Sequence, residues 1–280
     1  MKILFIGGNH PRHLYYANKI NEKFPFSGAI IQMRETLLPK PDPDLEEHDK
    51  QNFLKHFLNR EKLEQKYFGD QELPMCNTLK INKDELNSKK SSQFVNENKP
   101  DLVLIFGCSL IKDPLYSTLP TDSINLHLGL SPRYRGSATL FWPFYFMEPN
   151  FAGSTFHYII SEPDAGNFIH QSTPKLEIND TIHDVGCKTV IQSTDDVLKL
   201  LKIYKEKKCW KKYTQKGTGK NFLQNDFKPE QLRVIYDIFN DNGCLLCHNT
   251  MTLYGGLDLS TYSGTINGGN NGPIIDSENT

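Results

Sequence analysis

Two short apolar runs, each ended by glycine, most constrain what this chain can fold into. Residues 3–6 read Ile-Leu-Phe-Ile before Gly7-Gly8, and residues 102–106 read Leu-Val-Leu-Ile-Phe before Gly107. The second run shows no alternation between apolar and polar residues, which is typical of a strand buried on both faces of a parallel sheet. Segments with helical periodicity follow strand segments through the first hundred residues. The sequence therefore predicts an α/β fold.

Further strands and helices extend this alternation. Strands are expected at 29–33, 124–127, 154–160 and 168–172, and helices at 12–23, 45–67 and 181–205. The helix at 45–67 is charged, with Phe53, Leu54, Phe57 and Leu58 on one face, and follows three closely spaced prolines. We expect this helix to be an elaboration on the sheet.

The character of the chain changes after residue 208. Lysines crowd residues 202–220, a small helix is expected at 229–240 with Asp226 as its upstream cap, and the sequence after Leu253 is rich in Gly, Ser, Thr and Asn. The sequence thus predicts a core domain over 1–208 and a small α+β extension over 209–280 with a turn-rich tail.

Composition excludes several classes of protein. The 280 residues carry a net charge of -1, with 38% hydrophobic residues, which disfavours a general nucleic-acid binder. The apolar runs fall far short of the ~20 residues that span a bilayer, and the N-terminal run is too short for a signal peptide. Six cysteines are too sparse for a disulfide scaffold. We expect a cytoplasmic protein with reduced thiols.

Two motif fragments have little weight. Residues 244–248 match C-x-x-C-H, but haem attachment needs an export signal and tetrahedral zinc needs a second ligand pair, so no metal site is expected. Residues 217–220 read Gly-Thr-Gly-Lys without the Ser or Thr that follows in a phosphate-binding loop. Both segments are interpreted as ordinary loops.

The turn after the first strand is a better binding candidate. A glycine-rich turn before a helix presents backbone N–H groups and the helix dipole to an anion. Asn9, His10 and Arg12 add donors there, which could hold a diphosphate or a sugar, although a solvated turn accounts for them equally well. G-x-G-x-x-G is absent, so a dinucleotide fingerprint is excluded.

The most informative stretch surrounds Asn125 and His127. Residues two apart on a strand point to the same face, and the carboxyl ends of strands are where open α/β sheets bind ligands. Asp164 lies in a tight loop downstream, after a strand that carries His157. Its carboxylate could orient the His127 imidazole, raise its pKa and stabilise the cation.

Together these residues resemble the formyltetrahydrofolate-dependent formyltransferase family. Asn125, His127, Pro132, Tyr134, Arg135 and Gly136 match its N-x-H-x-x-x-x-P-x-[YW]-R-G block, and His157, Asp164 and Gly166 match its second block. The resemblance covers roughly residues 1–205 and implies a Rossmann-like core with a mainly parallel sheet. One departure is Gly129-Leu130, where many members have Ser or Leu; it affects the geometry of the loop.

The resemblance also implies roles for individual residues. It implies that Asn125, His127 and Asp164 are catalytic and that 10-formyltetrahydrofolate is the co-substrate. Folate binding falls on two loops, with candidate residues Gly107, Ser109, Leu110, Ile111, Ile160, Glu162 and Pro163. Acceptor binding is expected at Asn9, His10, Arg12, Tyr134 and Arg135, while Trp142 is interpreted as a core residue.

Among the subfamilies, the chain is most similar to the sugar N-formyltransferases. Their pattern continues into 219–223, 226–229 and 232–241. The expected reaction is formylation of a nucleotide-linked amino dideoxy sugar, such as a dTDP-sugar, for O-antigen or other lipopolysaccharide precursors. A homodimer is expected, with no nucleic-acid or membrane partner.

Three alternatives stay open. Methionyl-tRNA formyltransferase is favoured only by the lysines at 202–220, because phosphate contacts dominate RNA affinity. Glycinamide ribonucleotide formyltransferase shares the core but leaves the extension unexplained. A non-catalytic folate- or nucleotide-binding protein on the same fold is the alternative from another class, and the intact set of Asn125, His127 and Asp164 argues against it.

Overall fold

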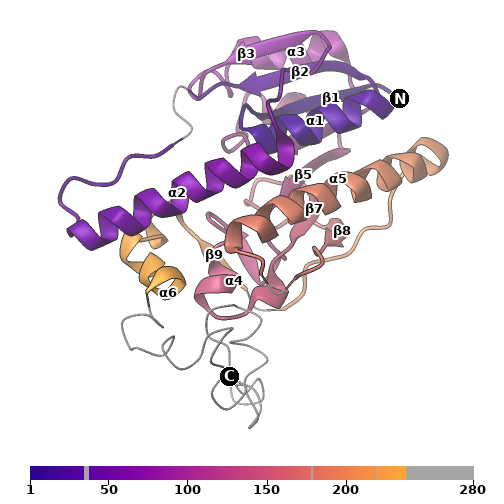
Figure 1. The fold of residues 1–280 in the computed structure, drawn as a ribbon. Helices are drawn as coiled ribbons and strands as arrows, with labels where there is room; N and C mark the ends of the chain where they lie inside the picture. Colours follow the sequence, from indigo (N-terminus) through magenta and orange to yellow (C-terminus); the bar gives the residue numbers. More distant parts are fainter. Residues whose placement is uncertain (35–37, 178, 218, 238–280) are drawn as a thin grey trace.

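The computed structural model describes residues 1–34, 38–177, 179–217 and 219–237, and its centre is one sheet of seven strands (Figure 1). The strand order is β3-β2-β1-β4-β5-β7-β8. The first five are mutually parallel, whereas β7 and β8 run antiparallel to their neighbours. Their bounds are β1 Ile3–Gly8, β2 Phe26–Gln32, β3 Thr78–Ile81, β4 Leu102–Phe106, β5 Ser123–His127, β7 Ser154–Tyr158 and β8 Phe168–Ser172. The predicted α/β class with a mainly parallel sheet is confirmed.

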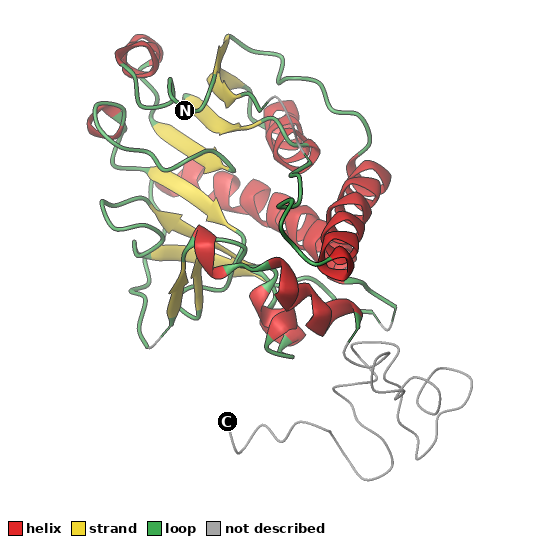
Figure 2. Ribbon diagram, turned by 90° about the vertical axis from the view of Figure 1, so that its left-hand side faces the viewer, coloured by secondary structure: helices red, strands yellow, loops and turns green. Residues whose placement is uncertain are grey.

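Helices lie on both sides of this sheet (Figure 2). The α-helices are α1 Pro11–Lys23, α2 Glu47–Phe68, α3 Lys89–Asn98, α4 Trp142–Tyr145, α5 Ile182–Lys207 and α6 Arg233–Tyr236, and the 3₁₀ turns are η1 Tyr116–Thr118, η2 Pro149–Phe151, η3 Gln224–Asp226 and η4 Pro229–Leu232. Within the described residues, no helix is both long and apolar enough to cross a bilayer.

The two faces of the sheet bury separate sets of side chains. One cluster joins Phe5, Leu104 and Leu126 to residues of α1 and α5, and another joins Ile6 and Ile105 to α3. The strands β1, β2 and β4 contribute alternate residues to both clusters, which explains the unalternated apolar runs in their sequences. Since Ile124 and Leu126 face α1 and α5, Asn125 and His127 point to the opposite face.

The long helix α5 has clear boundaries in the sequence. The Thr181 hydroxyl accepts from the Asp184 N–H, while the Asp184 carboxylate accepts from the Thr181 N–H, forming a capping box. The helix ends at Lys207 and is followed by Lys208 as its C-cap, whose φ of 59° is left-handed. The predicted domain boundary falls at this residue and stays a prediction.

Beyond α5 the chain returns to the core. β9 (Lys220–Phe222) pairs in parallel with β6 (Tyr134–Gly136), forming a second, two-stranded sheet. Phe222 and Leu232 are buried in a further hydrophobic cluster with Tyr134 and Trp142. The described part of the extension thus packs directly on the signature loop, and Trp142 is the core residue that was predicted.

Several local predictions need correction. Leu54 and Leu58 of α2 are about half exposed, because the helix buries Phe53 and Phe57 instead. Asp226 does not cap the next helix: its carboxylate accepts from the Leu223 N–H, and the segment from Pro229 starts as a 3₁₀ turn. The end of that predicted helix, the C-x-x-C-H segment and the Gly/Asn-rich tail lie outside the described residues.

Candidate active site

Three polar side chains on β5 and β7 lie on one face of the sheet. The two strands are antiparallel and pair Asn125 with His157, so these side chains are cross-strand neighbours. The Asn125 Nδ2 lies 3.2 Å from His157 Nε2, and His127 lies two residues further along β5. Pairing of two strands that are close in sequence therefore assembles an amide and two imidazoles.

Asp164 joins this group from the loop after β7. Its Oδ2 lies 3.4 Å from His127 Nδ1 and its Oδ1 lies 3.3 Å from His157 Nε2, so each carboxylate oxygen faces one imidazole. The Gly136 N–H donates to the same carboxylate at 3.0 Å, which ties it to the signature loop. The predicted group of Asn125, His127 and Asp164 is thus brought together, with His157 as a fourth member.

Burial sets the charge of His127. Burial lowers the pKa of His127 below its ordinary value, although Asp164 and the Tyr134 carbonyl both favour the charged form. This corrects the expectation that the pKa would be raised, because the loss of hydration outweighs the nearby carboxylate. Burial also opposes ionisation of Asp164, but the hydrogen bond to His157 and the charge of His127 outweigh it and lower the pKa of Asp164 to about 2.

This charge state defines what His127 can do. The Tyr134 carbonyl can only accept, so the His127 Nε2 donates to it over 3.0 Å. The Asp164 carboxylate faces the other ring nitrogen. A neutral imidazole held between two acceptors is prepared to take up a proton, since both neighbours stabilise the cation that results.

Gly129 sets how closely the signature loop can approach His127. A Cβ at this position would lie 2.6 Å from the Tyr134 carbonyl oxygen and 2.7 Å from His127 Nε2. Both distances are shorter than any real contact of a Cβ atom, so a side chain at residue 129 would push the imidazole or the loop aside. The departure from the family pattern at this residue therefore fits the packing of this chain.

The two loops predicted to bind folate share one region of the core. Cys108, Ile111 and Ile159 pack against the same hydrophobic cluster. The buried Gln32 side chain fixes the first loop, because it accepts from the Ser109 N–H and donates to the Ser109 hydroxyl. Leu110 and Ile160 are about half exposed and present apolar surface on these two loops.

The residues predicted at the turn before α1 have different surroundings. The Asn9 amide pairs with the backbone of Arg34 and thereby joins this turn to the end of β2. His10 is buried, and burial together with the neighbouring arginines lowers its pKa to about 2, so it offers no positive charge. Arg12 reaches the other way and forms a 2.7 Å ion pair with Glu64.

Tyr134 and Arg135 of the signature block contact different parts of the site. The buried Tyr134 donates its hydroxyl to Glu148 and stacks its ring near Phe222, so its carbonyl, not its side chain, reaches His127. Arg135 lies 3.7 Å from Glu162 of the second predicted folate loop. The structure gives the Tyr134 side chain a structural partner in place of the predicted acceptor contact.

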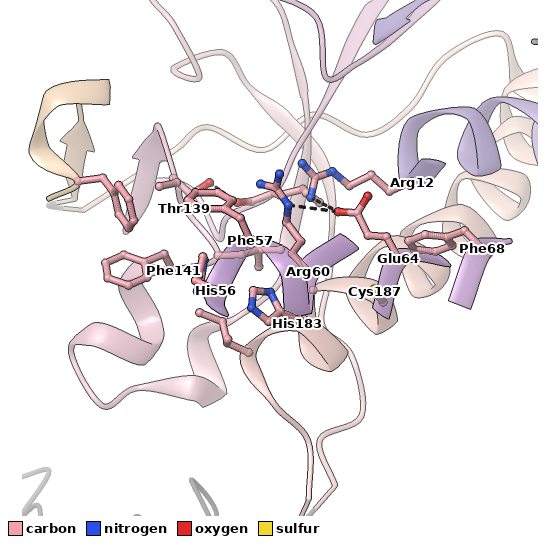
Figure 3. A pocket seen from close by; sticks show the side chains of 16 residues that line it. Arg12, His56, Phe57, Arg60, Glu64, Phe68, Thr139, Phe141, His183 and Cys187 are labelled. Carbon is pink, nitrogen blue, oxygen red and sulfur yellow. Dashed lines mark hydrogen bonds and ion pairs between the residues drawn. The ribbon is translucent and has the colours of Figure 1, made fainter. Parts of the chain in front are cut away.

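A cavity of about 300 Å³ opens next to the group of Asn125, His127 and Asp164 (Figure 3). Its walls come from α1, α2, the loop before α4, α5 and the extension. Its polar and aromatic lining includes Arg12, His56, Phe57, Arg60, Glu64, Thr139, Phe141, His183 and Phe227. Thr139 connects the cavity to the imidazole, because its Cβ and His127 Nε2 both lie within 3 Å of the position that a Cβ would take at Gly129.

Comparison with a family model decides how this arrangement is classified. Residues 54–197, just over half of the chain, match the model described as formyl transferase. The chain belongs to the formyl transferase family. The matched range contains Asn125, His127, His157 and Asp164.

Curated members of the formyl transferase family match only part of the chain. The methionyl-tRNA formyltransferase of Macrococcus caseolyticus is 28% identical over 119 residues, covering 42% of this chain and 38% of that protein. The one from Azobacteroides pseudotrichonymphae is 30% identical over 105 residues, covering 35% and 32%. The chain thus spans about a third of the length of these relatives.

Solved formyltransferases share the fold at low sequence identity. The phosphoribosylglycinamide formyltransferase of Anaplasma phagocytophilum is 17% identical, with a TM-score of 0.55, over 80% of this chain and 97% of that one. A 4-N formyltransferase from Francisella tularensis is 18% identical, with a TM-score of 0.51, over 81% and 78%. These likenesses confirm the predicted Rossmann-like formyl transferase fold.

Most residues that line the cavity could not be predicted from sequence motifs. Arg60 and Glu64 are four residues apart on α2 and therefore share a helix face, which is the one signal that pairs them. His56, His183 and Phe227 come from three separate elements, and nothing in the sequence connects them. Within the described ranges, no group of three or more His, Cys, Asp or Glu side chains is placed to hold a metal ion.

Proposed function

We propose that this formyl transferase moves the formyl group of 10-formyltetrahydrofolate to the amine of a nucleotide-linked amino sugar. The observation that carries the proposal is the group of Asn125, His127 and Asp164. A solved sugar 3N-formyl transferase with the same fold, a TM-score of 0.50 and 17% identity, was obtained in the presence of dTDP and 5-N-formyl-THF. That likeness supports both a folate donor and a nucleotide-linked acceptor.

The polar group fits the charges that formyl transfer creates. The acceptor amine attacks the formyl carbon, a new C–N bond forms, and negative charge develops on the formyl oxygen. The Asn125 amide is positioned to donate to that oxygen, as oxyanion-stabilising amides do. The bond from the formyl carbon to the folate nitrogen then breaks.

His127 handles the proton in this scheme. Because its pKa is lowered, the imidazole is neutral near pH 7 and accepts the proton that the attacking amine loses. Asp164 stabilises the imidazolium that forms, and the same proton then passes to the departing folate nitrogen. The acceptor amine would replace the Tyr134 carbonyl as the partner of Nε2. The neutral imidazole would then carry its proton on Nδ1 and donate it to Asp164, which leaves Nε2 bare to accept the amine proton.

The two apolar loops suit the folate. Leu110 and Ile160 offer exposed apolar contacts for a flat heterocycle, and the backbone of 107–111 offers donors and acceptors. Gln32 holds Ser109 in place from behind. We therefore assign donor binding to Gly107, Ser109, Leu110, Ile111, Ile160, Glu162 and Pro163.

We also propose the biological setting. The product would be an N-formyl sugar nucleotide used for surface-polysaccharide precursors in the cytoplasm, and the enzyme would act as a homodimer. Methionyl-tRNA is the second candidate acceptor, because the curated relatives are methionyl-tRNA formyltransferases. Glycinamide ribonucleotide is a third, since a solved relative bears that activity in its name.

One assay separates these acceptors. The purified chain is supplied with 10-formyltetrahydrofolate and, in parallel reactions, with dTDP- and UDP-linked amino sugars, methionyl-tRNA or glycinamide ribonucleotide, and products are identified by a formyl mass gain. Formylation of an amino sugar nucleotide supports the proposal. Formylation of methionyl-tRNA or glycinamide ribonucleotide alone would reassign the acceptor, and no tetrahydrofolate release in any reaction would remove the enzymatic assignment.

A further inference from the structure

We propose that the cavity between α1, α2 and α5 binds the nucleoside diphosphate of the acceptor, with Arg12 and Arg60 on the diphosphate and Phe57, Phe141 and Phe227 around the base. This inference rests on the proposed function and adds the residues that select the acceptor. None of Arg60, Phe57, Phe141 or Phe227 belongs to the signature blocks.

The charge of the lining argues for an anion. Arg12 and Arg60 approach one carboxylate, Glu64, at 2.7 and 3.8 Å (Figure 3). His56 and His183 add no charge near pH 7, because burial lowers their pKa values to about 2 and about 4. Among the lining residues that the structure describes, two guanidiniums lie against one carboxylate, which favours an anion, and planar guanidiniums suit phosphate oxygens.

The positive charge is held in place. The Glu64 side chain is only 5% exposed, and the side chains of Arg12 and Arg60 are 23% and 22% exposed. The two arginines come from different helices, so their approach is fixed by the packing of α1 against α2. Like charges brought together in a partly dehydrated site attract an anion more strongly than they would in water.

Aromatic rings line the rest of the cavity. Phe57 lies one helical turn before Arg60, and the Arg60 guanidinium stacks over the Phe57 ring at 4.7 Å. Phe141 and Phe227 meet edge to face, with ring centroids 4.9 Å apart. Phe rings offer faces on which a base can stack without a demand for one particular base.

The position of the cavity matches an acceptor whose amine must reach His127. Thr139 lies at the boundary, and only the space at Gly129 separates it from the imidazole. A ligand that binds its phosphates at Arg12 and Arg60 would therefore extend its sugar towards His127. No residue of the donor loops at 107–111 and 160–163 is among the described residues that line the cavity, so these loops stay available for folate.

Binding measurements on the full chain test this assignment without relying on turnover. Titration calorimetry with UDP, dTDP and inorganic pyrophosphate is carried out on the wild type and on Arg60→Gln, Phe227→Leu and Lys199→Gln. The matched control Lys199→Gln removes one positive charge from an exposed pair with Asp196 on α5, outside the cavity lining.

We expect Arg60→Gln to weaken UDP and pyrophosphate by about tenfold or more, as loss of a charge-assisted hydrogen bond does. Phe227→Leu keeps apolar volume but loses the aromatic face, so it should weaken UDP by about fivefold or more and leave pyrophosphate unchanged. Lys199→Gln should change neither. Equal affinities for Arg60→Gln and Lys199→Gln, or no UDP binding by the wild type, would overturn the inference.

Failure of the cavity assignment can be distinguished from failure of the proposed reaction. Turnover on an amino sugar nucleotide without inhibition by UDP or dTDP would remove the cavity assignment while the reaction stands. UDP binding that depends on Arg60, without formylation of any amino sugar nucleotide, would support a nucleotide site and overturn the proposed acceptor.

Discussion

Asp164 and Glu64 are both carboxylates enclosed between two nitrogen-bearing side chains, and they serve different ends. Asp164 faces His127 and His157, whereas Glu64 faces Arg12 and Arg60. Histidine can gain and lose a proton near neutral pH, but arginine stays charged. One buried carboxylate thus controls a proton, and the other fixes a pair of positive charges.

The largest effect should come from removing the imidazole of His127. His127→Asn should lower kcat by about 10²–10⁴-fold, the usual contribution of a positioned acid–base group, and leave folate binding intact. His170→Asn is the matched control, because His170 lies on β8 and pairs with Asp196 of α5. Steady-state rates and folate titrations check both variants, and a fully active His127→Asn enzyme would remove the catalytic assignment.

A substitution at Phe222 tests whether the extension stabilises the signature loop beside His127. Its buried ring stacks on Trp142 at 4.3 Å, and β9 pairs with β6 next to His127. Phe222→Ala should lower the free energy of unfolding by about 3–5 kcal/mol, as loss of a buried aromatic does. Phe146→Ala, at a ring that is 45% exposed, should cost much less in the same denaturant titrations. Equal costs would show that β9 does not support the loop.

Gly129 lies between the catalytic group around Asp164 and the cavity that contains Glu64. A side chain added at this residue should therefore disturb both regions. Gly129→Ala places a methyl within 2.8 Å of Tyr134, His127 and Thr139. Displacement of the imidazole by about 1 Å should lower kcat by roughly 10²-fold. Rates and melting temperatures are measured together. An unchanged kcat in a folded Gly129→Ala protein would contradict the close packing around His127.

Asp164 predicts a pH dependence of stability. Its pKa is about 2 in the fold, below the ordinary 3.8, so its stabilisation is fully present above about pH 4 and is lost as the pH falls towards 2. Asp164→Asn lacks this ionisation. The difference in unfolding free energy between the two proteins should therefore shrink by up to roughly 2 kcal/mol over that range. Denaturant titrations at pH 6 and pH 2 measure it, and a constant difference would contradict the assigned charge.

The catalytic group was predictable because its geometry is local. Asn125, His127 and His157 lie on two strands that pair directly, and strand periodicity places them on one face. The sequence also predicted β4 and β8 with their observed bounds, since apolar runs mark buried strands. What failed was the direction of the pKa of His127, because its burial depends on the whole fold.

The cavity and several elements were not predictable for related reasons. Its lining comes from helices and loops far apart in the chain, and only Arg60 and Glu64 share a local pattern. β3 and α3 were missed because β3 has only four residues and α3 has only ten, most of them polar. β6 and β9 have three residues each and exist through their mutual pairing.

The most direct test of this division is a kinetic comparison of Arg60→Gln with His127→Asn on the acceptor that the wild type formylates. Arg60→Gln should raise the acceptor KM and leave the folate KM unchanged, whereas His127→Asn should lower kcat and leave both KM values near those of the wild type. If Arg60→Gln instead lowered kcat with an unchanged acceptor KM, or if it raised the folate KM, the assignment of catalysis to one region and acceptor selection to the other would be contradicted.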